Sequence, residues 1–138
     1  MRETQCATIQ RILSDGRWHP VDEFMQAQIP DYRRRLCDLR AAGRHLDRRP
    51  RAHVRADGSR SHPRNDWMDV EANAAVGQEV YRQVVQARAS HQGGAHAHTS
   101  VQITLPGTSI NVALGRVLYL SAGQMTAEIM AGWADSAL

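Results

Sequence analysis

The chain has 138 residues and a formal net charge of +3, and all 17 of its lysine-plus-arginine positions are arginine. This length holds one domain of ordinary size, or a small domain with an appendage. The two cysteines, Cys6 and Cys37, form no CxxC or CxxH pair, which favours free thiols over a disulfide framework or a cysteine zinc site. No signal-like leader and no 18-residue apolar segment occur, so we expect a soluble, cytoplasmic protein with no membrane partner.

The positive charge is concentrated in the first half of the chain. Residues 1–70 hold 14 arginines and 10 acidic residues, whereas residues 71–138 hold three arginines and four acidic residues. The densest stretch, residues 30–64, holds 11 arginines and four acidic residues. Genome composition is an alternative explanation for the absence of lysine, but it does not explain the clustering. The clustering indicates a nucleic-acid partner.

Two short helices are expected before the densest basic stretch. Apolar residues at helical spacing predict a first helix over residues 3–15, which ends at the Asp15-Gly16 pair. Trp18 and His19 predict a short extended piece. A proline followed by acidic residues predicts a second helix over residues 20–28.

A third helix is expected from Pro30 or Asp31 to Gly43, with the Asp31 side chain capping free backbone amides. At 100° per residue, its apolar side chains share one face, which we expect to pack on the first two helices: Tyr32, Leu36 and Leu39. The remaining side chains point away from that face and are free to enter a groove: Arg33, Arg34, Cys37 and Ala41.

A basic hairpin is expected after this helix. Residues 45–48 predict one strand and residues 67–70 the returning strand, and the turn formers of residues 56–63 predict the tip. Six arginines lie on or beside this hairpin: Arg48, Arg49, Arg51, Arg55, Arg60 and Arg64. A basic helix followed by a basic hairpin is typical of a winged helix-turn-helix.

The second half predicts a long helix and then a linker. A helical stripe over residues 71–89 indicates an amphipathic helix with one apolar face, formed by Val76, Val80, Tyr81 and Val84. The glycine- and histidine-rich residues 91–99 predict a linker.

The last 40 residues predict a hairpin and a helix. Alternating apolar residues favour strands over residues 101–105 and from residue 110 to about Leu120, joined by a turn at residues 106–109. Helical spacing from residue 110 to 118 remains an alternative. A final helix from Ser121 would carry one apolar face, formed by Met125, Ile129, Met130 and Trp133.

The arginines at the start of the third helix are the leading candidates for DNA contact. A recognition helix presents its N-terminal residues to base edges, and arginine pairs with guanine O6 and N7. We therefore expect Arg33 and Arg34 to enter a groove, with a solvated helix face as the alternative. Arg35 lies nearer the buried flank, which fits a phosphate contact and an internal ion pair equally well.

The hairpin arginines are expected to contact phosphates, which gives affinity without sequence information. This set comprises Arg48, Arg49, Arg51, Arg55 and Arg60. Arg60, which follows Gly58-Ser59 at the tip, is the candidate for insertion into the minor groove. The alternative is an exposed loop that charge keeps soluble.

Other candidate sites are weaker. Trp18, Tyr32 and Trp67 are expected to pack in the core, and Cys37 is expected to be an inert thiol rather than an oxidant sensor. No Cys, Asp or Glu accompanies the linker histidines, so we expect no metal and no cofactor at His91, His96 and His98. The common nucleotide-binding, hydrolase and metalloprotease motifs are absent, and we expect no enzyme activity.

Residues 5–70 resemble the small winged helix-turn-helix proteins of bacteriophages and prophages. The resemblance rests on Ile29-Pro30, the arginines from Arg33 to Arg35, the Asp38-Leu39-Arg40 triplet, and Gly43. It implies that Arg33 and Arg34 face a DNA groove and that Arg40 faces the DNA backbone. Asp38 departs from the family's glutamate, the hairpin is longer than in minimal members, and residues 71–138 have no counterpart in the resemblance.

We therefore expect an α+β protein with four parts: a winged helix-turn-helix over 1–70, a connecting helix over 71–90, a linker over 91–99, and a hairpin-plus-helix module over 100–138 that forms oligomers or binds a partner. The expected function is a repressor-like transcriptional regulator that binds double-stranded DNA as a homodimer. The alternatives are a phage-type inhibitor that binds a host protein or nucleoprotein complex, and an architectural factor that bends DNA.

Overall fold

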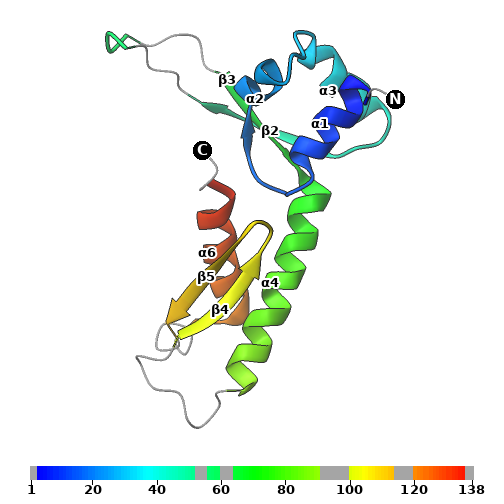
Figure 1. Cartoon of the computed structure of the whole chain (residues 1–138). Coiled ribbons are helices and arrows are strands. Elements are labelled where there is room, and N and C mark those ends of the chain that lie inside the picture. Colours follow the sequence, from blue (N-terminus) through cyan, green and yellow to red (C-terminus); the bar gives the residue numbers. More distant parts are fainter. Residues whose placement is uncertain (1–2, 52–55, 60–63, 91–99, 114–119, 136–138) are drawn as a thin grey trace. The chain divides into compact units, whose positions relative to one another are not determined.

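The computed structural model of the chain describes residues 3–51, 56–59, 64–90, 100–113 and 120–135 (Figure 1). The described chain is α+β, with five helices, a three-stranded antiparallel sheet, and a C-terminal hairpin followed by a helix. It divides into two compact units: Met1–Asn73 together with Asp135–Leu138, and Ala74–Ala134. Among the helices described, none is long and apolar enough to cross a membrane.

Three short helices pack around one core in the first unit. They are α1 (Gln5–Leu13), α2 (Val21–Gln26) and α3 (Tyr32–Ala41). The Thr4 hydroxyl caps α1 by accepting a hydrogen bond of 3.1 Å from the backbone N–H of Ala7. Side chains from the helices and from the strands beside them form the core: Ile9, Leu13, Val21, Phe24, Ile29, Leu36, Leu39, Leu46 and Trp67.

The sheet of the first unit is antiparallel and has the strand order β1-β3-β2. Its strands are β1 (His19–Pro20), β2 (Leu46–Arg51) and β3 (Arg64–Asp69). The central strand places Trp67 opposite His19 on one side and opposite Arg48 on the other. The predicted extended piece and the predicted hairpin are therefore both present, and they belong to one sheet.

The ends of several elements differ from the prediction. The strands expected over 45–48 and 67–70 are Leu46–Arg51 and Arg64–Asp69, because their pairing continues toward the hairpin tip as far as Arg51 and Arg64. Asp31 occupies the N-cap position of α3, but its side chain makes no capping hydrogen bond, since its backbone (φ −99°, ψ 36°) departs from the usual extended cap conformation. The return strand ends at Asp69 rather than at Val70. The Asp69 carboxylate accepts a hydrogen bond of 3.1 Å from the N–H of Ala72, and this contact starts the next helix at Val70. Gly43 follows α3 with a φ of 98°, as the prediction of a glycine stop requires.

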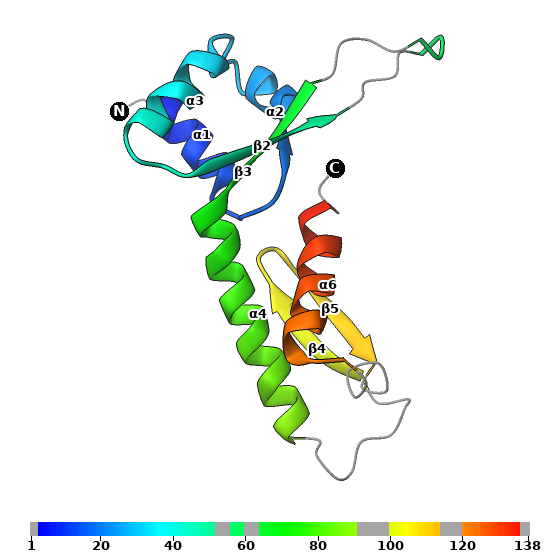
Figure 2. The same cartoon turned by 180° about the vertical axis from the view of Figure 1, so that it is seen from behind.

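The second unit combines two helices with a hairpin (Figure 2). Its elements are α4 (Val70–Ser90), which begins in the first unit, β4 (Ser100–Leu105), β5 (Thr108–Ala113) and α6 (Ala122–Asp135). The predicted hairpin is confirmed, and its two turn residues are Pro106 and Gly107. Gly107 has a positive φ of 77°, which the second residue of such a turn requires when the first is proline. Residues 114–119, where the second strand was expected to continue, lie outside the described part of the chain.

The core of this unit joins both helices to one face of the hairpin. It includes Val80, Val84, Ile103, Leu105, Val112, Met125, Ile129 and Trp133. The predicted faces of α4 and α6 are thus confirmed at most positions, but Tyr81 is 48% exposed and lies outside the core. α6 starts with a capping box, in which the Ser121 hydroxyl accepts from the N–H of Gln124 and the Gln124 side chain accepts from the N–H of Ser121.

Candidate nucleic-acid interface

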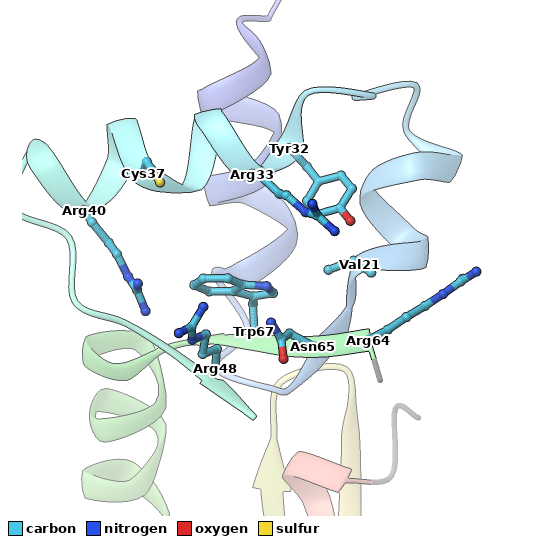
Figure 3. A pocket seen from close by; sticks show the side chains of 9 residues that line it. All are labelled: Val21, Tyr32, Arg33, Cys37, Arg40, Arg48, Arg64, Asn65 and Trp67. Carbon is cyan, nitrogen blue, oxygen red and sulfur yellow. The ribbon is translucent and has the colours of Figure 1, made fainter. Parts of the chain in front are cut away.

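A groove of about 320 Å³ lies between α3 and the β2–β3 strands (Figure 3). Four arginines line it, and they come from three elements: Arg33 and Arg40 from α3, Arg48 from β2, and Arg64 from β3. The other lining residues are uncharged: Val21, Tyr32, Cys37, Asn65 and Trp67. A groove lined by cations and by no acidic side chain concentrates positive potential and attracts an extended anion.

Helix α3 holds Arg33 and Arg34 on its exposed side. Leu36 and Leu39 are buried in the core and fix the rotation of the helix, so the two arginines project away from the core. Tyr32 packs against the Phe24 ring, and the Arg33 guanidinium lies 5.9 Å from the Tyr32 ring centroid. Within the described residues, neither arginine has an ion-pair partner. Both charges are therefore available to an external anion.

Arg48 provides a similar charge from the sheet. It is exposed on β2, opposite Trp67 in the register, and its side chain lines the groove. Its backbone N–H donates to the Asp47 carboxylate at 2.9 Å, but no described residue pairs with its guanidinium. Arg48 thus adds a third charge that no acid neutralises.

Arg40 is held in place between α3 and the sheet. Its guanidinium lies 4.8 Å from the Trp67 ring centroid, and it donates a hydrogen bond of 3.0 Å to the carbonyl oxygen of Leu46. These contacts hold the Arg40 guanidinium in place at the groove, although no acidic side chain pairs with it. Figure 3 shows Arg40 reaching down from α3 and Arg48 lying on the strand below the Trp67 ring.

Arg49 and Arg51 have an internal role that the sequence did not indicate. Both donate from Nε to the same oxygen of Asp66, at 3.2 and 3.1 Å, and Asp66 is only 1% exposed. Arg49 also lies over the Trp18 ring, 4.4 Å from its centroid, and Trp18 is half-buried rather than part of the main core. A buried carboxylate requires such partners, so these two arginines hold the two long strands together.

Other arginines of this unit also pair with acids, and three of them lie on or beside α3 and the hairpin. Arg35 donates to Asp38 at 3.2 Å and to the Gln5 side chain at 3.0 Å, so it forms the ion pair that was one of its two expected roles. The expected phosphate contact stays a prediction. The sequence prediction did not select the other two: Arg44 bonds to the buried Asp69 at 2.6 Å, and Arg64 bonds to Asp22 at 2.5 Å. No local signal distinguishes these pairs, because the partners lie 25 and 42 residues away along the chain.

Several predicted positions lie outside the described residues. They are Arg55, Arg60, His91, His96 and His98. In the part of the chain that the structure describes, no three His, Cys, Asp or Glu side chains form a metal-binding group. Cys37 is exposed and lines the groove, and Cys6 is half-buried behind α3, where its thiol lies 3.9 Å from the carbonyl oxygen of Arg35.

A second charged cluster lies at β1, the edge strand of the sheet opposite β2. The nearly buried His19 ring bonds to Asp15 through Nε2 at 2.8 Å and to Glu23 through Nδ1 at 2.5 Å. Burial alone would lower the pKa of His19, but the hydrogen bond to Asp15 and the charges of both acids outweigh it, so the pKa is raised. Burial would raise the pKa of Asp15, but its hydrogen bonds to His19 and to the Arg17 backbone lower it. The cluster ties α1, β1 and α2 together.

No protein-family model, curated protein or solved structure matches this chain.

Proposed function

We propose that the first unit is a winged helix-turn-helix domain that binds double-stranded DNA. The order α1-β1-α2-α3-β2-β3, with β1 and β2 on either side of β3, supports this assignment. The protein would then be a repressor-like transcriptional regulator of phage or prophage origin that acts as a dimer in the cytoplasm. The observation that carries the proposal is the groove between α3 and the hairpin, which four arginines and no acidic residue line.

In this mechanism, α3 enters the major groove. Arg33 and Arg34 lie at its N-terminal end, the part of a recognition helix that reaches base edges, and their guanidinium groups can donate to guanine O6 and N7. Arg48 on β2 contacts a phosphate beside the groove, and Arg40 supports that contact from its fixed position on Trp67. The bound protein would block the promoter that contains the site.

The test is a titration of the full chain against DNA from just upstream of its own gene, with scrambled DNA of the same length as the reference. We expect selective binding that Arg33→Ala/Arg34→Ala weakens by at least ~30-fold, since each bidentate base contact contributes about 1–3 kcal/mol. Arg82→Ala is the matched control, because Arg82 is an exposed arginine of the second unit that pairs with Glu79.

Each alternative function has its own result in this titration. Equal affinity for both DNA sequences together with bending of the DNA would favour an architectural factor. Absence of DNA binding would contradict the proposal and direct attention to a protein partner of the basic groove.

A further inference from the structure

The two edges of the C-terminal hairpin differ. On the outer edge of β4, the Gln83 side chain of α4 satisfies both backbone hydrogen-bonding groups of Thr104. Gln83 Nε2 donates to the carbonyl oxygen of Thr104 at 2.9 Å, and the N–H of Thr104 donates to Gln83 Oε1 at 2.7 Å. No residue of the described chain pairs with the outer edge of β5. An unpaired strand edge is a template for another strand, and folded proteins usually protect it with charge, proline or a cover.

The contact with Gln83 identifies the backbone groups that point outward. In an antiparallel pair, residues alternate between those that bond across the pair and those that face away. Thr104 faces away, and it lies opposite Ser109. By the same alternation, the N–H and C=O groups of Ser109, Asn111 and Ala113 point out from the free edge of β5.

A hollow of about 450 Å³ runs beside this edge, between β5 and α6. Most of its lining is apolar and comes from Ile110 and Val112 on the strand and from Met125, Ile129 and Gly132 on the helix. Glu128 on the helix is the charged residue among the residues that line it. A strand added to β5 would place every second side chain over this hollow. The edge therefore offers both hydrogen-bonding groups and an apolar surface to one extended segment.

We propose that the β5 edge pairs with the β5 edge of a second copy of this chain, so that two hairpins form one four-stranded sheet. With a twofold axis at Asn111, Asn111 lies opposite itself, and Ser109 lies opposite Ala113 of the other copy. The six outward groups of each strand then bond to the same six groups of its copy. Ile110 comes opposite Val112 of the copy, above the apolar hollow, where such pairs stabilise a sheet.

The composition of the strand favours a second copy over an unrelated segment. Thr108–Ala113 contains no charged residue, so two copies meet antiparallel without like charges facing each other. The strand also contains no proline, and its length of six residues suits a strand in a stable sheet. This interface deepens the dimer of the proposed function, but it involves no residue of the DNA groove.

The test compares two proline substitutions in the full chain, without DNA. Asn111→Pro removes an outward N–H from β5, whereas Gln102→Pro removes the outward N–H of the residue directly opposite on β4. Neither change deletes a backbone hydrogen bond between the two strands, because proline is tolerated where the N–H faces outward. Gln102→Pro also removes the side-chain hydrogen bond of 2.8 Å from Gln102 Nε2 to Ser109 Oγ, so it is the harsher change for the hairpin itself. Mass from light scattering and analytical ultracentrifugation is the readout, and circular dichroism checks folding.

We expect wild-type protein and Gln102→Pro at twice the chain mass of 15.4 kDa, and Asn111→Pro at the single chain mass. Asn111→Lys, which puts two like charges opposite each other at the twofold axis, should dissociate the dimer in the same way and settles the question if Asn111→Pro does not fold. A monomeric wild type, or a folded Asn111 variant that stays dimeric, would overturn the proposal. Arg33→Ala/Arg34→Ala should remain dimeric, so a failure of DNA binding is distinguishable from a failure of this interface.

Discussion

The arginines of the first unit fall into two groups with the same chemistry and different surroundings. Arg33, Arg34, Arg40 and Arg48 are exposed and have no acidic partner among the described residues. Arg44 bonds to the carboxylate of Asp69, and Arg49 and Arg51 bond to that of Asp66. Both carboxylates are almost fully buried. The high local density of arginine therefore has two causes in this protein. One group is available to a ligand, and the other stabilises the hairpin that positions the first.

The largest expected effect is on the internal group. Asp66→Ala removes the shared acceptor of Arg49 and Arg51, and we expect it to lower the free energy of unfolding by about 2–3 kcal/mol. The loss stays below that of a fully buried pair, because both arginines are about one third exposed and can reach water. Urea denaturation measures it, with Asp57→Ala as a control that removes only local hydrogen bonds to Ser59 in an exposed turn and should cost less than Asp66→Ala.

The same variant separates stability from binding. The folded fraction of Asp66→Ala keeps all four arginines that have no acidic partner among the described residues, so it should bind DNA at least as tightly as the wild type. If Asp66→Ala has wild-type stability but no DNA affinity, the division into two groups is wrong.

Titration of His19 gives a smaller effect on the same unit. Its pKa is raised in the folded state, so its contribution to stability is fully present below pH 6.5 and is lost as the pH rises through the raised value. Asp15 has a lowered pKa, so its contribution is present above pH 3.8 and is lost as the pH falls through the lowered value. The free energy of unfolding should therefore decline on both sides of this window.

His19→Gln should remove the decline on the alkaline side and reduce the decline on the acid side, because the hydrogen bond to His19 is one of the causes that lower the pKa of Asp15. Urea denaturation at a series of pH values measures both. His45→Gln, which removes an exposed histidine without touching Asp15 or Glu23, is the control. A wild-type profile that is as flat above pH 6.5 as that of His19→Gln would contradict the assigned role of the cluster.

Local patterns predicted most helices and strands, because each depends on spacing within a few residues. Leu36 and Leu39 set the face of α3, the Pro106-Gly107 turn set the register of the second hairpin, and Met125, Ile129 and Trp133 set the face of α6. Tyr81 was predicted in the core of α4 and is exposed, since periodicity alone does not show where the apolar face of a helix ends.

The functional site was less predictable, because it depends on pairing between distant residues. The sequence placed Arg48, Arg49 and Arg51 in one group, yet only the sheet register brings Asp66 to Arg49 and Arg51 and leaves Arg48 without an acid. Asp66 itself carried no signal, since one acid in a basic hairpin reads as a solvated residue. The contact of Gln83 with the edge of β4 was equally invisible, because it joins residues 21 positions apart.

The most direct test of the account compares two arginines of the same strand, Arg48 and Arg51, by DNA titration over a range of salt concentrations. We predict that Arg48→Ala reduces the slope of log affinity against log salt by about 0.9 and changes stability by less than ~0.5 kcal/mol. Arg51→Ala should leave the slope unchanged and cost about 1 kcal/mol or more of stability. Equal slopes for the two variants, or a loss of slope in Arg51→Ala alone, would contradict the claim that the arginines without an acidic partner carry the function.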